Sequence, residues 1–125
     1  MVSPAVGKVI LVPFPFSDLS KSKMRPAVVL ADAGRGDWIL CQITSNPYGD
    51  PNAIVVNNES FTQGSLRIIS FARPGKLFTA SSGLVFGEVG ELSADVAGQI
   101  INAVIELLRR SIAIRGTKDE KDSHY

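Results

Sequence analysis

An arginine and two hydroxyl side chains stand at the ends of neighbouring apolar runs, and together they suit a phosphate group. Arg25 precedes Pro26, which restrains the arginine backbone toward an extended form. A guanidinium offers phosphate oxygens a planar fork of donors and keeps its positive charge. Thr44 and Ser45 end a later apolar run, and their hydroxyls reach the same anion if the two runs pair. The alternative is that Arg25 forms a surface ion pair while Thr44 and Ser45 cap a turn.

Further basic residues lie in two turn-like segments. Lys21 and Lys23 belong to a polar stretch over residues 14–24, between two apolar runs, where loops commonly carry contacts. Arg73 and Lys76 flank a Pro-Gly pair. These four side chains either extend a basic groove around Arg25 or are solvated residues of ordinary turns.

Several kinds of enzyme site are excluded by the scarcity of their residues. The only histidine, His124, stands next to the end of the sequence, so a Ser-His-Asp or Cys-His arrangement is implausible. One cysteine and one histidine do not make a zinc site. Neither a Walker loop nor a dinucleotide-binding glycine pattern occurs, and the carboxylates are scattered. Cys41 lies inside an apolar run and is expected to be inert core. We predict no cofactor and no metal.

Composition is that of one folded domain, and its charge is local. The 125 residues are 45% hydrophobic with a formal net charge of +1. Residues 1–81 hold eight Lys and Arg against five Asp and Glu, whereas residues 82–125 hold five against seven. A nucleic-acid contact would therefore be a patch rather than a basic surface. A single cysteine, no signal-peptide pattern and no apolar run long enough for a bilayer predict a cytoplasmic protein without membrane contact.

Many short strands precede one terminal helix. Residues 32–37 form a glycine-containing turn between two of these strands, which predicts a hairpin. The domain is expected over residues 1–115, followed by a disordered tail over 116–125. The expected strands cover residues 8–12, 27–31, 38–43, 53–56, 65–71, 76–79 and 84–89, and the helix covers about 93–111.

The predicted helix has an unusually broad apolar side. Ser93 suits its N-cap and Asp95 its first turn. The apolar side is wide enough to cover a sheet and a second partner, which predicts a dimer and a groove for a partner segment. The fold class is therefore mainly β, a small barrel closed by a C-terminal helix.

The chain resembles the MazF/PemK family of toxin endoribonucleases from bacterial toxin–antitoxin pairs. The resemblance runs from Gly7 to about Leu108 and includes the strand V-I-L-V-P-F-P-F. It rests further on R-P-A-V-V-L from Arg25, C-Q-I-T-S from Cys41, S-F-A-R-P-G-K-L-F-T from residue 70 and G-E-L-S from residue 90.

The resemblance implies an SH3-like barrel of the CcdB/PemK-like toxin fold, a homodimer, a cognate antitoxin partner and metal-independent cleavage of single-stranded mRNA. Arg25 and Thr44 take the catalytic roles, with the ribose 2′-hydroxyl attacking the adjacent phosphate. The expected RNA-binding residues are Lys21, Lys23, Ser45, Ser70, Arg73 and Lys76. The alternative function is a non-catalytic toxin of the same fold that inhibits a protein such as gyrase.

Two positions depart from the family pattern. Many relatives have an acidic residue directly after the first glycine, where this chain has Lys8. Some carry an aspartate where this chain has Ser70. No general base is assigned, so catalysis is expected to depend on phosphate stabilisation by Arg25.

Overall fold

The computed structural model describes residues 3–14 and 23–121, with side chains as far as residue 116. This part of the chain forms one seven-stranded sheet and one long helix, α1 (Ala94–Lys121). The strand order is β4-β6-β3-β2-β1-β7-β5, and each recorded pair is antiparallel. The strands are β1 (Lys8–Pro13), β2 (Met24–Gly34), β3 (Asp37–Thr44), β4 (Ile54–Val56), β5 (Phe61–Gly64), β6 (Ser70–Ser81) and β7 (Gly87–Leu92). The predicted mainly β fold with a C-terminal helix is confirmed.

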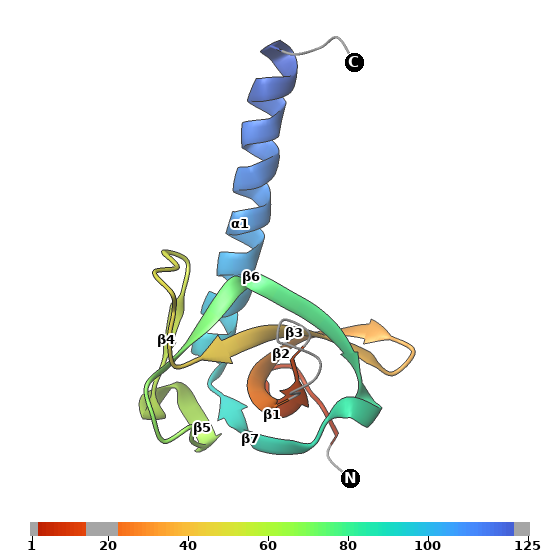
Figure 1. Ribbon diagram of the computed structural model, residues 1–125, viewed down its shortest axis with the longest axis vertical. Coiled ribbons are helices and arrows are strands. Elements are labelled where there is room, and N and C mark those ends of the chain that lie inside the picture. Colours follow the sequence, from red (N-terminus) through yellow and green to blue (C-terminus); the bar gives the residue numbers. More distant parts are fainter. Residues whose placement is uncertain (1–2, 15–22, 122–125) are drawn as a thin grey trace.

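The sheet curls into a half-barrel because its two edge strands are close in sequence. β4 and β5 occupy opposite ends of the strand order, yet only Asn57–Ser60 separate them. So short a connection spans at most about 18 Å, which forces the two edges together. Figure 1 shows the resulting curl, with β1 and β2 inside it and β6 arching over one side.

The central strands bury both of their faces, which explains their nearly continuous apolar sequences. On β1, Val9 packs with a core cluster that reaches Ile100 of α1, whereas Ile10 and Val12 pack with a second cluster. The side chains of β2 alternate in the same way, with Val28 in the first cluster and Ala27 and Val29 in the second. The period of two residues therefore supplies two cores, and the helix covers one of them.

Strand boundaries in the second half of the sheet differ from those predicted. The predicted strand 65–71 begins only at Ser70, and β7 begins at Gly87 rather than at residue 84. β5 (Phe61–Gly64) lies between the predicted strands 53–56 and 65–71, in a stretch where no strand was predicted. Its side chains are mostly exposed because it is an edge strand, so no apolar run marks it.

Pro74 and Gly75 do not break the sixth strand, contrary to the sequence interpretation. β6 runs through both residues from Ser70 to Ser81. Its pairing with β3 shifts register between Cys41 and Ile43, so that Pro74 and Gly75 lie where the ladder is interrupted. A proline without an N–H is tolerated at such a bulge.

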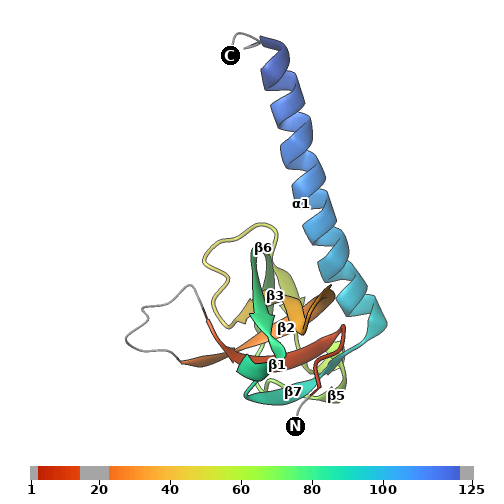
Figure 2. The same cartoon turned by 90° about the vertical axis from the view of Figure 1, so that its right-hand side faces the viewer.

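The helix begins as predicted but continues much further. Ser93 Oγ accepts the N–H of Val96 at 3.3 Å, so the predicted N-cap is present. α1 then runs to Lys121, past the expected end near residue 111 and into the expected tail. Figure 2 shows its second half standing clear of the barrel. The exposed apolar side chains there include Ile105, Leu108, Ile112 and Ile114.

The hairpin of β2 and β3 is tied to the segment after β6 at its far end. Trp38 Nε1 donates to Ser82 Oγ at 3.1 Å, and Ser82 Oγ donates to Gly36 O at 3.0 Å. Arg35 in the turn has a φ of 58°, in the left-handed region.

In the described part of the chain, no helix has both the length and the apolar character to cross a bilayer.

Candidate functional site

Strand register brings the arginine and the threonine together. The β2–β3 ladder pairs Ala27 with Gln42 and Val28 with Cys41. Continued by two residues beyond its last recorded pair, the same register sets Arg25 opposite Thr44. Side chains of directly opposed residues lie about 5 Å apart at Cβ. The hairpin thus provides the juxtaposition on which the phosphate-site prediction depended.

A pocket of about 290 Å³ opens at this end of the hairpin. Two strands and the segment before β6 contribute its walls, and both apolar and polar side chains line it. The lining residues are Arg25, Pro26, Ile43, Thr44, Ser45, Leu66, Ile68 and Ser70. The structure therefore gathers four predicted site residues, Arg25, Thr44, Ser45 and Ser70, around one space. We call this space the arginine pocket.

Arg25 is the positive charge of the arginine pocket. Its side chain is exposed, and among the side chains of residues 3–14 and 23–116 no ion pair joins it to a carboxylate. The alternative, a surface ion pair of Arg25, finds no support in these residues. An arginine at a pocket wall without a carboxylate partner favours an anion from outside the protein.

The hydroxyls of the pocket have different freedom. Thr44 Oγ1 accepts the N–H of Asn46 at 3.2 Å, so it does cap a turn, but its own hydrogen remains able to donate. Ser70 is only 4% exposed and donates to Ile68 O at 3.2 Å. Thr44 is therefore better placed than Ser70 to hydrogen-bond an anionic oxygen.

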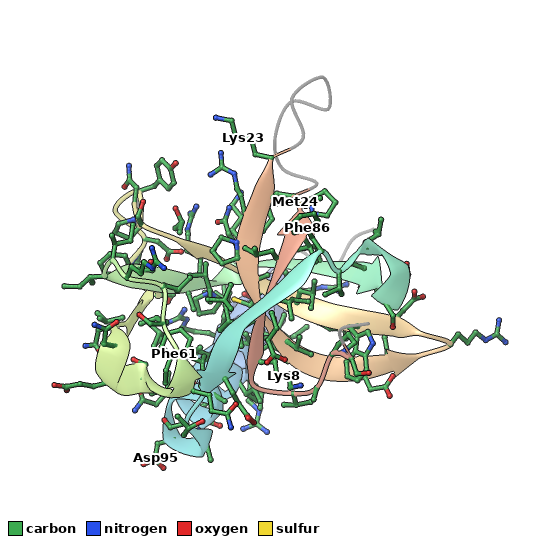
Figure 3. All side chains as sticks on the ribbon, turned by 90° about the horizontal axis from the view of Figure 1, so that it is seen from below. Lys8, Lys23, Met24, Phe61, Phe86 and Asp95 are labelled. Atoms are coloured by element: carbon green, nitrogen blue, oxygen red, sulfur yellow. The ribbon has the colours of Figure 1, made fainter. Side chains whose placement is uncertain are left out.

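Of the two lysines predicted to bind RNA between the first two strands, only Lys23 is among the described residues. Lys21 lies outside the described residues. Lys23 is exposed just before β2 and does not line the arginine pocket. Figure 3 shows Lys23 beyond the end of β2 and Lys8 far away at the other end of the barrel. Lys8 pairs with Glu88 at 2.9 Å, and this hydrogen bond raises the lysine pKa above its ordinary value. The departure at Lys8 therefore lies outside the pocket.

Arg73 is committed to the protein itself. Its Nε donates to Asp50 Oδ2 at 3.0 Å, with side chains 17% and 11% exposed, and its guanidinium lies 5.4 Å from the Tyr48 ring centroid. Desolvation would raise the pKa of Asp50, but the N–H of Asn52 and the Arg73 side chain together lower it. Arg73 thus ties the loop after β3 to β6. Lys76 is half-buried in β6, and neither residue lines the arginine pocket.

Cys41 belongs to the core, as expected. It is fully buried, and its Sγ donates to Arg73 O at 3.1 Å. Burial raises the pKa of the thiol to about 12, so the nucleophilic thiolate does not form near neutral pH. Among the residues that the structure describes, no cluster of His, Cys, Asp and Glu is arranged to hold a metal ion.

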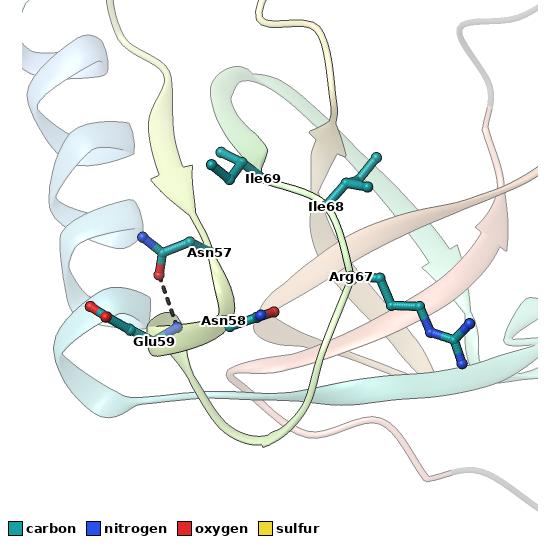
Figure 4. A pocket seen from close by; sticks show the side chains of 6 residues that line it. All are labelled: Asn57, Asn58, Glu59, Arg67, Ile68 and Ile69. Atoms are coloured by element: carbon teal, nitrogen blue, oxygen red, sulfur yellow. Dashed lines mark hydrogen bonds between the residues drawn. The ribbon is translucent and has the colours of Figure 1, made fainter.

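A second pocket, of about 260 Å³, lies beside the first and was missed from the sequence. Figure 4 shows its lining, with Ile68 shared between the two pockets. Its polar residues come from a loop that reads as ordinary polar surface, so no sequence pattern marks it. The lining residues are Asn57, Asn58, Glu59, Arg67, Ile68 and Ile69. We call it the amide pocket.

Comparisons with known proteins agree with this architecture. Residues 5–108 match the family model described as PemK-like, MazF-like toxin of type II toxin-antitoxin system. The fold is similar to MazF of Deinococcus radiodurans, with a TM-score of 0.64 and 20% identity over 86% of this chain and 98% of that one. An endoribonuclease from a mycobacterial species, solved with its cognate antitoxin, has a TM-score of 0.63 and 14% identity over 86% and 95% of the two chains. A sequence comparison with curated proteins found no match.

Proposed function

Because the chain belongs to the family of PemK-like, MazF-like toxins of type II toxin–antitoxin systems, we propose that it is an endoribonuclease that cuts single-stranded mRNA at specific sequences without a metal ion. The observation that carries the proposal is the arginine pocket, where an exposed arginine with no carboxylate partner among the described side chains shares one space with a threonine hydroxyl that can donate. Similar structures that are named endoribonucleases agree with this assignment.

The proposed reaction needs little from the protein beyond positive charge and positioning. The ribose 2′-oxygen attacks the adjacent phosphorus and passes its proton to water, while the bond from phosphorus to the 5′-oxygen breaks and that oxygen takes a proton from water. The products are a 2′,3′-cyclic phosphate and a 5′-hydroxyl end. Arg25 stabilises the charge that grows on the phosphoryl oxygens, and Thr44 donates a hydrogen bond to one of them. Since the nucleophile belongs to the RNA, no metal-bound water is required.

The side chains that line the arginine pocket agree with a reaction in which the protein supplies charge and positioning and the RNA supplies the nucleophile. The residues described around it include no carboxylate and no imidazole. The pocket therefore offers electrostatic stabilisation rather than an evident general base. Ser45 is exposed at its rim, and Ser70 can accept but not donate. We assign these two residues to RNA positioning, together with Lys21, Lys23 and Lys76 at longer range, whereas Arg73, also predicted to bind RNA, is paired with Asp50.

The chain is further proposed to act as a homodimer and to bind an antitoxin protein. Solved complexes of similar chains contain an antitoxin. The exposed apolar side chains on the projecting half of α1 provide a surface that water disfavours, which suits a second copy of the chain. Ile105, Leu108 and Ile112 are three and four residues apart, so they lie along one side of the helix with the spacing found at helix–helix interfaces.

Incubation of the purified protein with a long single-stranded RNA in excess EDTA tests the proposed activity. We expect defined cuts that end in cyclic phosphate, and loss of these cuts with Arg25→Ala. Cleavage that persists in Arg25→Ala, or no cleavage by the wild type across varied sequences, contradicts the proposal. Growth arrest that survives Arg25→Ala and Thr44→Val would instead favour the non-catalytic inhibitor.

A further inference from the structure

The two pockets lie on opposite sides of one stretch of chain. Leu66, Ile68 and Ser70 line the arginine pocket, whereas Arg67, Ile68 and Ile69 line the amide pocket. The chain bends at Arg67, whose φ is 69°, and residues 66–70 lie between the two pockets and contribute side chains to both. Ile68 belongs to both linings and is 61% exposed. The arginine pocket and the amide pocket are therefore adjacent at Ile68.

A hydrogen bond from Ser65 takes one of the two lone pairs of the Asn58 amide oxygen. Ser65 Oγ accepts the N–H of Arg67 at 2.9 Å and donates its own hydrogen to Asn58 Oδ1 at 2.7 Å. The amide oxygen of Asn58 thus already has a partner, while no described residue is recorded as accepting from its NH₂ group. Figure 4 shows the Asn58 side chain directed toward the side of the pocket where Arg67 lies. An asparagine held this way presents two N–H donors and one remaining lone pair, so it favours acceptors over donors.

Asn57 and Arg67 also present donors in the amide pocket, whose lining includes one carboxylate, that of Glu59. Asn57 Oδ1 accepts from Glu59 N at 2.9 Å and from Ser60 Oγ at 3.3 Å, which leaves its NH₂ group as a donor. Arg67 adds a guanidinium, which carries donors alone. Its φ of 69° is unfavourable for a residue with a side chain, and the bond to Ser65 helps to hold it there.

The apolar part of the pocket suits the flat face of a base. Ile68 and Ile69 are 61% and 62% exposed, although large aliphatic side chains prefer burial. A base resting on them would remove apolar surface from water while its edge meets the amides. Uracil and guanine present carbonyl oxygens at the edge where cytosine and adenine present an amino group.

We propose that the amide pocket is a base-specific subsite for single-stranded RNA, in which the Asn58 amide selects a keto base next to the bond cut at the arginine pocket. The assignment of the neighbouring cut rests on the proposed endoribonuclease function, whereas the base preference does not. Ser65 is a positioning residue, since its hydroxyl takes one lone pair of the amide oxygen and thereby fixes which side of the amide the NH₂ group faces.

Binding of short oligomers measures this preference without cleavage. Fluorescence anisotropy compares 2′-O-methyl hexauridylate with 2′-O-methyl hexacytidylate, which lack the nucleophile and differ mainly in the keto or amino group at C4. We expect uridylate to bind roughly fivefold more tightly, because the cytosine amino group leaves a donor facing a donor. Hexainosinate against hexaadenylate repeats the comparison for purines and shows which ring size fits.

Three variants separate recognition from general loss of affinity. Asn58→Asp replaces donors by acceptors and should reverse the preference toward cytidylate. Ser65→Ala frees the amide oxygen of Asn58, so the ratio of the two affinities should fall toward one. Asn102→Asp makes the same chemical change at an exposed position on α1 and should leave the ratio unchanged.

Equal binding of uridylate and cytidylate by the wild type overturns the proposal, as does a ratio that Asn58→Asp does not change. A change of sedimentation in Asn58→Asp without a change in the ratio would assign the pocket to a protein contact and also overturns it. Cleavage of long RNA is scored separately. Base preference without cleavage contradicts the endoribonuclease alone, and cleavage without base preference contradicts the subsite alone.

Discussion

Arg25 is an exposed residue whose removal should affect chemistry and not folding. We expect Arg25→Ala to reduce RNA cleavage by about 10²- to 10³-fold, the effect typical of losing one donor to a charged transition state. Arg25→Lys should lie between this variant and the wild type, because it keeps the charge but loses the planar fork. Initial rates on one defined RNA measure the series.

A matched control for this series is Arg109→Ala. Arg109 is equally exposed but lies on α1, so its removal should leave the cleavage rate unchanged. Urea unfolding of all variants should give nearly the same free energy as the wild type. An Arg25→Ala protein that cleaves like the Arg109→Ala protein would remove Arg25 from the mechanism.

Arg73 and Asp50 have a structural role with a defined pH dependence. The pKa of Asp50 in the folded protein lies below its ordinary value of 3.8. The carboxylate therefore stabilises the fold at pH values above about 4, and this contribution is lost as the pH falls through the lowered pKa. We expect Arg73→Met to lower the free energy of unfolding at pH 7 by about 1–3 kcal/mol, the cost of leaving a mostly buried charge unpaired.

The pH series distinguishes this pair from a merely exposed charge. In the wild type, part of the stability measured by urea unfolding should disappear between pH 5 and pH 3, and this fall should be smaller in Arg73→Met. Arg109→Met serves as the control without a carboxylate partner in the described residues. Identical slopes in all three proteins would show that the pair does not contribute.

The arginine pocket was predictable from sequence because its two main residues stand on adjacent strands of a hairpin. Ile68 and Leu66 were not predictable, since the segment before β6 has neither strand pairing nor a turn pattern to fix its direction. The hydrogen bond that orients the Asn58 amide was equally hidden. It depends on the Ser65 hydroxyl, seven residues away in sequence, and no local pattern encodes that bond.

Among the elements, the contact of β5 with β7 depends on two glycines. A Cβ on Gly90 would collide with Gln63 O and approach Phe61 Cδ2, and a Cβ on Gly64 would collide with Val89 O. Because both obstacles are largely backbone, they cannot move without breaking the pairing. We expect Gly90→Ala to lower the free energy of unfolding by about 1–3 kcal/mol or more, as measured in urea.

Gly98 provides the opposite case on the helix. A Cβ there meets nothing within 4 Å, and the position lies inside α1. Gly98→Ala should therefore raise stability by about 0.5–1 kcal/mol through helix propensity. If Gly90→Ala and Gly98→Ala changed the free energy of unfolding in the same direction, the close approach of β5 and β7 would not determine the effect at Gly90.

The elements with an apolar period were predictable, and those without one were not. β1, β2, β3 and the start of α1 follow their patterns because both strand faces are buried and Ser93 caps the helix. β5 escaped prediction because an edge strand with exposed side chains needs no apolar residues. The second half of α1 was not predicted because its described side chains are mostly exposed. The helix prediction relied on a buried apolar side, and the described side chains of this part of the helix form none.

For the molecule as a whole, the projecting half of α1 predicts self-association. We expect the protein to sediment as a dimer at micromolar concentration and the double variant Leu108→Glu, Ile112→Glu to sediment as a monomer. Charged side chains at a helix seam remove the apolar contact and repel each other. Asn102→Glu, a charge added at an exposed polar position of the same helix, should leave the dimer intact.

Far-ultraviolet circular dichroism should be unchanged in the double variant, since both side chains are more than half exposed. A wild-type protein that sediments as a monomer contradicts the homodimer. If the double variant remained dimeric, the contact between copies would have to lie on the barrel instead.

The hydrogen bond from Trp38 to Ser82 makes the fluorescence of Trp38 a probe of the folded barrel. Trp38 is the only tryptophan of the chain, and it lies near the turn end of β3, six residues from Thr44 at the other end. At about 3.4 Å per residue, the indole is roughly 20 Å along the strand from the arginine pocket. Its fluorescence therefore reports the closure of the barrel during folding, while a ligand that fills the pocket leaves the indole untouched.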